Sequence, residues 1–176
     1  ANQYQQWSGV GGGSPNSELR MPQWKADPIT QPLPAIFHGR LVTDQLLTSK
    51  VLGYQTMYSG YLPPNYQPAG KEVFPVLYVL DGYEYLHPQL GNMTTTLDNL
   101  IHTQKIQPVI TVFVDNREPV NRANNRRMNE LAMNSKYLDF FANELIPAIQ
   151  TQYPVKAEAK SRAIIGTSMG GLTATY

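Results

Sequence analysis

Residues 162–176 read RAIIGTSMGGLTATY, and this stretch decides how the rest of the chain is interpreted. An apolar run typical of a buried strand ends at Gly166, and the run that follows is compatible with a helix. Between them, Gly166 to Gly170 match the pattern G-x-S-x-G. The serine of this pattern sits on a sharp strand-to-helix turn, where side chains two residues before and after it would clash. The pattern predicts that Ser168 has strained φ and ψ angles, a hydroxyl open to a cleft, and the role of a nucleophile. The alternative is a glycine-rich turn with a capping serine.

Two more short apolar runs lie upstream, FPVLYVL at 74–80 and PVITVFV at 108–114. Both are typical of strands buried on both faces of a parallel sheet. Each run is followed by a helical pattern, whose apolar positions are Met93, Leu97, Leu100 and Ile101, and then Tyr137, Phe141, Leu145 and Ile149. Ser135 is the expected cap of the second helix, and 36–49 and 52–66 are expected to form strands. This alternation predicts an α/β fold with right-handed crossovers and a ligand site where the strands lead into helices.

The composition favours an extended N-terminal arm over residues 1–35 and one domain over residues 36–176. Residues 9–16, GVGGGSPN, are rich in glycine and serine. A chain of 176 residues that is 41% hydrophobic suits a single globular core. The net charge of +1 gives no reason to expect nucleic acid as a partner, and no apolar run approaches the roughly 20 residues of a membrane span. The absence of cysteine excludes thiolate metal sites and suits a periplasmic or secreted protein, without excluding a cytoplasmic one.

The turn GTSMGGLTATY resembles the nucleophile elbow of the esterase D group of α/β-hydrolases, which includes enterochelin (siderophore) esterases, feruloyl esterases and mycolyltransferases. The resemblance covers about residues 38–176, and its other marks are HGRLVTDQLLTSKVLG, YLPPNY, FPVLYVLDG and NELAMNSKYLDFFANELIPAIQTQYPV. The DG ending and the stretch from Arg127 to Leu131 are more similar to the enterochelin esterases. The resemblance implies an α/β-hydrolase fold, with a mostly parallel sheet and helices on both faces. It also implies a serine esterase for small-molecule esters, without cofactor or metal.

Two backbone N–H groups are expected to bind the oxyanion of the tetrahedral intermediate. The G-x-S-x-G pattern assigns one of them to Met169, the residue after the serine. The resemblance places the other on Tyr83, which follows Asp81-Gly82 at the end of the first buried strand. Gly82 is expected to let the backbone approach the substrate closely. An ordinary turn is the alternative reading of Asp81-Gly82.

Four arginines follow the second buried strand and therefore belong to the edge where the ligand is expected: Arg117, Arg122, Arg126 and Arg127. An anionic substrate such as a ferric catecholate could be held there by charge-assisted hydrogen bonds. Asp81, Arg126 and Arg127 are the candidate substrate-binding residues. The alternative is a solvated loop held by Glu118 and Glu130.

All three histidines, His38, His87 and His102, precede Ser168, whereas the triad order of this fold is serine, acid, histidine. We therefore expect residues 1–176 to be the N-terminal piece of a longer hydrolase. The remainder of the same polypeptide would supply the acid and the histidine, and one side of the sheet near Ser168 should be uncovered. The favoured function is hydrolysis of small acyl or siderophore-type esters through an acyl-enzyme. The alternatives are a feruloyl or acetyl polysaccharide esterase, an acyltransferase of the same family, and a non-catalytic binding module.

Overall fold

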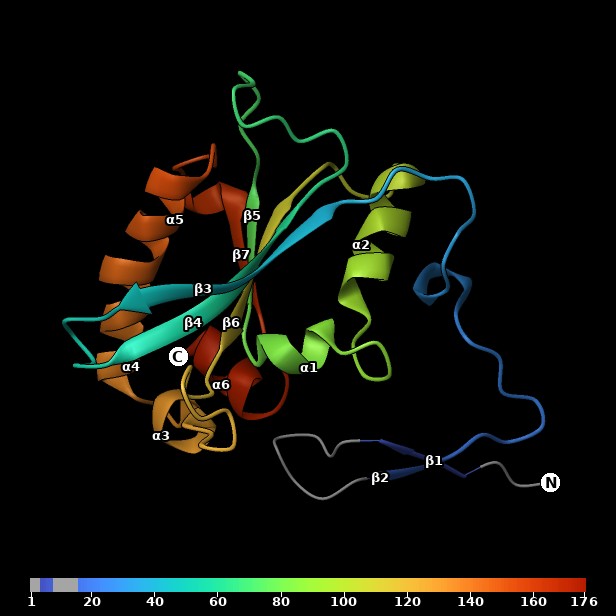
Figure 1. The fold of residues 1–176 in the computed structure, drawn as a ribbon, viewed down its shortest axis with the longest axis horizontal. Coiled ribbons are helices and arrows are strands. Elements are labelled where there is room, and N and C mark those ends of the chain that lie inside the picture. The colour runs from blue at the N-terminus through green and yellow to red at the C-terminus, as the bar shows by residue number, and fades with distance from the viewer. Residues whose placement is uncertain (1–3, 8–15) are drawn as a thin grey trace.

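The computed structural model describes residues 4–7 and 16–176 (Figure 1). Residues 9–15 of the glycine- and serine-rich stretch lie outside the described residues. Two short strands of the N-terminal region, β1 (Tyr4–Trp7) and β2 (Asn16–Leu19), pair antiparallel. The division into an arm over residues 1–35 and a domain over residues 36–176 stays a prediction.

The main sheet has five strands in the order β3-β4-β6-β5-β7. Their bounds are Arg40–Thr48 for β3, Gln55–Leu62 for β4, Val76–Val79 for β5, Ile110–Asp115 for β6 and Arg162–Ile165 for β7. β4 runs antiparallel to both of its neighbours, while β6, β5 and β7 are mutually parallel. Four strands therefore share one direction, and the prediction of a mostly parallel α/β sheet is confirmed.

Helices cover both faces of this sheet (Figure 1). On one face lie α1 (Gly82–Leu86) and α2 (Met93–His102), and on the other lie α4 (Ser135–Phe140), η3 (Phe141–Leu145) and α5 (Ile146–Gln152). Because side chains alternate along a strand, Val76 and Tyr78 of β5 belong to the core on the α4–α5 side. Val79 of the same strand packs on the α2 side. Two short helices, α3 (Arg127–Leu131) and α6 (Met169–Thr175), contact each other.

The second predicted helix begins one residue earlier than expected. Its N-cap is Asn134, whose side chain accepts hydrogen bonds from the N–H groups of Lys136 and Tyr137, so the prediction that Ser135 caps it is wrong. The middle of the helix, η3, is a π-helix. In an α-helix, side chains at i+4 steps drift around the axis by about 40° a step. The wider π turn counteracts this drift, and all four predicted apolar residues of this helix are buried.

The segment before the main sheet is fastened to α2 through Asn99. The Nδ2 group of this buried residue donates to the backbone carbonyl oxygens of Ile29 and Gln31, each at 2.7 Å. Ile29 belongs to η2 (Pro28–Thr30), a single turn of 3-10 helix, and Gln31 is its C-cap residue. Residues 27–31 therefore lie against α2 and on the same face of the sheet as α1.

The edge of the sheet next to Ser168 is uncovered, as predicted from the sequence. β7 is the last strand of the sheet and pairs only with β5 among the described strands. Ile164 in β7 is 39% exposed and Leu172 in α6 is 43% exposed. Across the described residues, no helix has the length and apolar character needed to cross a membrane.

Candidate active site

Ser168 occupies a strained turn between β7 and α6. Its φ is 57° and its ψ is −116°, values that lie outside the regions favoured by L-residues. The residue is exposed, and in the part of the chain that the structure describes its hydroxyl makes no hydrogen bond. The predicted strain is thus confirmed. A capping role is not supported, because the side chain of Ser168 makes no cap bond to α6.

The two glycines of the turn differ in what an added side chain would meet. A Cβ atom on Gly166 would lie 2.4 Å from the backbone carbon of Gly170, which is shorter than any tolerable contact. A Cβ atom on Gly170 would lie 3.1 Å from the Oδ2 atom of Asp81. Gly166 is therefore required by the tightness of the turn itself, whereas a side chain at Gly170 would need the Asp81 carboxylate to move by a few tenths of an ångström.

The register of the three parallel strands brings three loops together at one edge. Val79 of β5 is level with Phe113 of β6 and with Ile165 of β7. Asp81, Asp115 and Thr167 each lie two residues beyond these positions. The carboxyl ends of β5 and β6 therefore lie beside the turn that carries Ser168. The Leu80 N–H extends this alignment by donating to the Ile165 carbonyl oxygen at 2.9 Å.

Gly82 is required by its close packing against β6. It is buried, and a Cβ atom there would lie 2.5 Å from the backbone carbon of Phe113. The glycine therefore lets α1 begin directly against β6. The approach of Gly82 to the substrate stays a prediction.

The N–H groups of Tyr83 and Met169 lie in the first turns of α1 and α6. First-turn amides have no carbonyl partner inside their own helix. In the described part of the chain, neither group donates a hydrogen bond to any other atom. Both amides are thus available for an oxyanion, and their convergence on one point stays a prediction.

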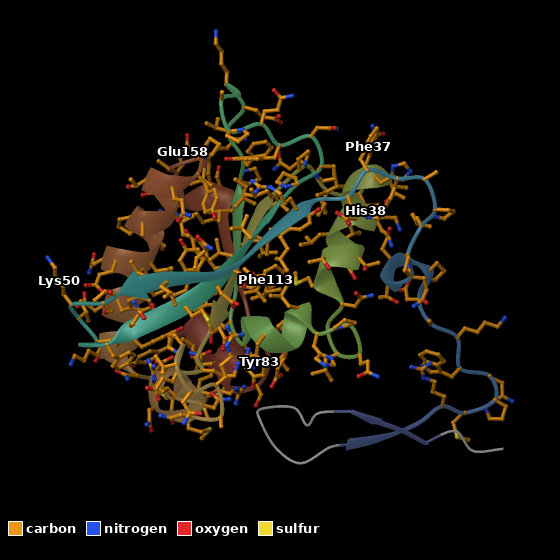
Figure 2. The ribbon with its side chains drawn as sticks, in the orientation of Figure 1. Phe37, His38, Lys50, Tyr83, Phe113 and Glu158 are labelled. Atoms are coloured by element: carbon orange, nitrogen blue, oxygen red, sulfur yellow. The ribbon has the colours of Figure 1, made fainter. Side chains whose placement is uncertain are left out.

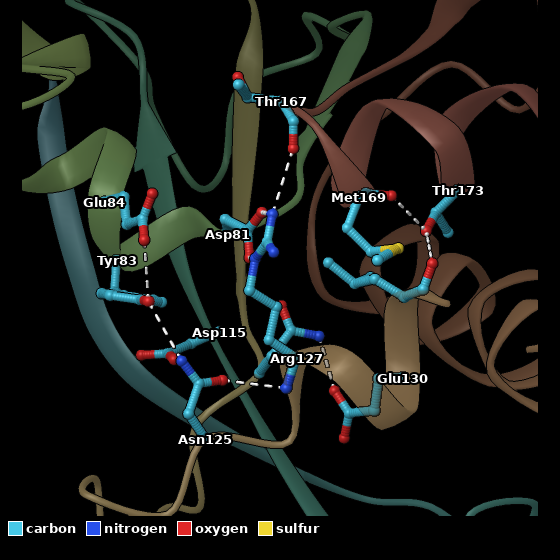
Figure 3. A network of polar contacts seen from close by, with 12 residues as sticks. Asp81, Tyr83, Glu84, Asp115, Asn125, Arg127, Glu130, Thr167, Met169 and Thr173 are labelled. Carbon is cyan, nitrogen blue, oxygen red and sulfur yellow. Dashed lines mark hydrogen bonds and ion pairs between the residues drawn. The ribbon is translucent and has the colours of Figure 1, made fainter. Parts of the chain in front are cut away.

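Arg127 binds Asp81 through two parallel hydrogen bonds (Figure 3). Its Nε lies 2.7 Å from Oδ1 and its Nη2 lies 2.9 Å from Oδ2 of the carboxylate, which is 1% exposed. Nη2 also donates to the Thr167 carbonyl oxygen at 3.2 Å. Burial raises the pKa of the Asp81 carboxyl, and the Arg127 guanidinium offsets part of that rise. Arg127 therefore links the end of β5 to the residue that precedes Ser168.

The other three arginines of the loop are also paired with carboxylates. Arg117 forms a bidentate pair with Asp115 and lies 4.0 Å above the ring of Tyr83. Arg122 contacts Asp44 at 2.9 Å. The charges of this loop are therefore compensated by carboxylates of the same protein. The role of Arg126 in binding an anionic substrate stays a prediction.

Arg126 and the buried Glu130 form the last of these pairs. The Nη1 atom of Arg126 lies 3.7 Å from Oε1 of Glu130, and its guanidinium stacks 4.1 Å above the ring of Tyr54. Glu130, predicted as a partner of the loop, is confirmed as one. Glu118, the other predicted partner, accepts a hydrogen bond from Asn124 instead.

Glu130 should make the stability of the protein depend on pH. Burial raises the pKa of this carboxyl, although hydrogen bonds from Asn116 at 2.6 Å and Tyr54 at 2.8 Å offset part of the rise. Between the ordinary pKa and the raised one, the folded state holds more protons than the unfolded state. The free energy of unfolding should therefore fall as pH rises through that window. Urea unfolding over a pH series should show a smaller fall for Glu130→Gln, whereas Glu72→Gln, at an exposed position, should keep the wild-type slope. Equal slopes in all three proteins would contradict the prediction.

The Ser168 hydroxyl makes no hydrogen bond in the described part of the chain, so none of the three histidines is bonded to it. His38 binds the buried Asp98 through Nδ1 at 2.9 Å and lies beside α2, whereas Tyr83 lies on α1 (Figure 2). His87 accepts a hydrogen bond from the Gln89 N–H at 3.2 Å. Among the described residues, no group of three or more potential ligand side chains could hold a metal ion.

Two contacts of the site had no signal in the sequence. Asn125 donates from Nδ2 to the Tyr83 hydroxyl at 3.2 Å, and the Tyr85 hydroxyl contacts Oγ1 of Thr167 at 2.5 Å. Such contacts join residues 42 and 82 positions apart. They depend on the strand register, which no local pattern encodes.

A cavity of about 300 Å³ opens beside Tyr83. Its charged lining residues come from β3, from β6 and from the loop after β6, and they are Asp44, Asp115, Arg117 and Arg122. Both signs of charge are therefore present next to the proposed oxyanion turn.

The comparisons with known proteins agree with this geometry. The family model Esterase matches residues 49–176. YjcH of Bacillus subtilis (strain 168), an uncharacterized protein, is 30% identical over 129 residues, which are 73% of this chain and 52% of YjcH. An endo-1,4-beta-xylanase/feruloyl esterase of Xylanibacter ruminicola is 32% identical over 145 residues, 78% of this chain and 19% of that protein. The iron(III) enterobactin esterase of Escherichia coli (strain K12) is 29% identical over 108 residues, 61% of this chain and 25% of that enzyme.

The fold is shared with solved esterase structures. The enterobactin esterase of Shigella flexneri, solved in the presence of enterobactin, superimposes with a TM-score of 0.72 at 23% identity, over 98% of this chain and 41% of that chain. The predicted α/β-hydrolase fold is confirmed. The chain spans about half the length of YjcH and smaller shares of the other two relatives.

Proposed function

Because this chain belongs to the esterase family, we propose that the whole protein is a serine carboxylic-ester hydrolase with Ser168 as its nucleophile. The observation that carries the proposal is the geometry of Ser168, which is exposed, strained at φ 57° and placed between Gly166 and Gly170 at the start of α6. Strain of this kind persists only where the surrounding structure enforces it, and it gathers at functional sites. An exposed serine held in this way has its hydroxyl accessible to the carbonyl carbon of a substrate.

The proposed reaction has two steps. The Ser168 hydroxyl attacks the acyl carbon while a general base removes its proton, and the alcohol leaves with a proton returned from that base. Water then attacks the acyl-enzyme and releases the acid. In both steps the N–H groups of Tyr83 and Met169 bind the oxyanion, where one such donor contributes about 10²–10³ in kcat.

The general base is proposed to be a histidine oriented by an acid, both outside residues 1–176. Two observations support this part of the proposal. The three histidines of the chain precede Ser168, and the chain spans only 52% of YjcH. A serine without a base is a weak nucleophile at neutral pH, so residues 1–176 alone should be inactive.

For the substrate we propose small acyl or siderophore-type esters. The iron(III) enterobactin esterase among the relatives supports this class. The mixed charges of the cavity beside Tyr83 also suit a polar substrate part. Feruloyl or acetyl esters of polysaccharide are the second candidate, favoured by the relative from Xylanibacter ruminicola. An exported location is part of the proposal, and the absence of cysteine is compatible with it.

The function is tested by labelling the whole protein with a fluorophosphonate, which modifies only an activated serine. We expect one label per chain, on the peptide that contains Ser168, and no label after the substitution Ser168→Ala. A protein that stays unlabelled would favour a non-catalytic binding module. Product analysis with an added alcohol acceptor then separates hydrolysis, which releases free acid, from acyl transfer, which forms a new ester.

A further inference from the structure

Asp81 stands at the N-cap of α1 without acting as a cap. A capping Asp ordinarily has extended backbone angles, and its carboxylate accepts from the N–H of the second or third helical residue. Asp81 instead has φ 55° and ψ 38° and makes no side-chain cap bond. Its two carboxylate oxygens are both bound by Arg127. The ion pair therefore takes the place of the helix cap.

The group left without a cap is the amide of Tyr83. Gly82 is the first residue of α1 and Tyr83 is the second, so the Tyr83 N–H is one of the two groups that a capping carboxylate would normally bind. The other group is the N–H of Glu84, the third residue of α1, and it donates to the Asp81 backbone oxygen at 2.9 Å. An Asp81 carboxylate released from Arg127 would find its free partner at Tyr83.

The conformation of Asp81 is held by Arg127 rather than by local preference. A left-handed backbone is unfavourable for a residue with a side chain, although Asp adopts it more readily than most. Asp81 is also 1% exposed, and an unpaired carboxylate is costly at such a position. Without the guanidinium, relaxation to an ordinary N-cap would relieve the backbone strain and give the charge a new donor.

We propose that Arg127 is a positioning residue that keeps the Tyr83 amide vacant for the oxyanion by holding the Asp81 carboxylate away from the first turn of α1. This inference rests on the proposed function. Arg127 does not touch the reacting atoms. Its effect passes through Asp81, while its bond to the Thr167 carbonyl oxygen fixes the guanidinium beside the turn of Ser168. The sequence prediction had assigned Arg127 to binding an anionic substrate, and the inference gives it a different task.

The first test measures ester turnover by the whole protein. Arg127→Ala should lower kcat about 10²-fold, because a carboxylate then occupies one oxyanion donor. KM should change little, and equally for an anionic and a neutral p-nitrophenyl ester. Adding Asp81→Gly removes the carboxylate and suits the positive φ, so the double variant should recover kcat to within about tenfold of wild type. A merely structural role predicts that the double variant is no better than Arg127→Ala, and that result would overturn the inference.

The second test does not depend on activity. Amide hydrogen exchange at Tyr83, followed by NMR, should become slower in Arg127→Ala by about fivefold or more, because the released carboxylate caps this N–H. General destabilisation would make the same amide exchange faster. Arg126→Ala is the matched control, since Arg126 contacts Glu130 and Tyr54 and should leave the Tyr83 exchange unchanged.

The two tests separate this inference from the proposed function. In one outcome the wild-type protein turns over no ester while Tyr83 exchange slows in Arg127→Ala as expected. That result would contradict the proposed function and would support the inference that Arg127 keeps the Asp81 carboxylate away from the Tyr83 amide. Unchanged or faster Tyr83 exchange in Arg127→Ala overturns the inference, whatever the turnover. If Arg127→Ala does not fold, Arg127→Gln removes the charge, retains a donor for Thr167, and should give the same two results.

Discussion

Ser168→Ala should abolish turnover of p-nitrophenyl esters by the whole protein, with kcat reduced at least about 10³-fold. No acyl-enzyme can form without the hydroxyl, and the remaining oxyanion donors give only the residual rate of a site without its nucleophile. The Ser168 side chain is exposed and makes no hydrogen bond in the described part of the chain. Its removal should therefore change the free energy of unfolding by no more than about 0.5 kcal/mol.

Steady-state kinetics and a thermal melt on the same samples check both statements. A folded Ser168→Ala variant that keeps more than a few per cent of the wild-type rate would remove Ser168 from the mechanism. An inactive variant with a much lower melting temperature would leave loss of folding as the explanation. The melt is therefore the necessary control.

Gly166→Ala should have the second largest effect. The added methyl group would lie 2.4 Å from the Gly170 backbone carbon and 2.5 Å from the Gly170 carbonyl oxygen. Because neither atom belongs to a flexible side chain, the start of α6 must move and carry the Ser168 hydroxyl and the Met169 amide with it. Misplacement of about 1 Å can cost about 10²-fold in rate, and overpacking typically costs about 1–3 kcal/mol of stability.

Gly53→Ala is the matched control for this substitution. Gly53 has φ +82°, so alanine is strained there, but no atom lies within 4 Å of the added Cβ. The control should lose stability by roughly 1–2 kcal/mol and keep its kcat. If both variants lost the same fraction of kcat, the close contact between Gly166 and Gly170 would have no special role in the site.

The parts of the fold that follow from local pattern could be predicted from the sequence. Short apolar segments bounded by turns are typical of strands buried on both faces of a parallel sheet. The runs at 74–80, 108–114 and 162–166 were predicted on this basis, and they form the three parallel strands β5, β6 and β7. The strained backbone of Ser168 followed from the spacing of Gly166 and Gly170. In each case the information lies within a few residues.

Contacts between distant parts of the chain could not be predicted, and one helix cap was wrong. Arg127 was assigned to substrate because nothing local shows that its partner is Asp81, 46 residues earlier. Gly82 was assigned to substrate approach because its contact with Phe113 exists only once α1 lies on β6. The cap at Asn134 was missed by one residue, since Asn and Ser at adjacent positions are both good N-cap residues.

A crystal structure of the whole protein after reaction with a p-nitrophenyl phosphonate tests the central claim most directly, because the adduct mimics the tetrahedral intermediate. The account predicts phosphorus bonded to Oγ of Ser168, with one phosphoryl oxygen about 3 Å from the N–H groups of both Tyr83 and Met169. An adduct on another residue would contradict the assignment of the nucleophile. An adduct on Ser168 whose phosphoryl oxygen contacts neither amide would contradict the proposed oxyanion site.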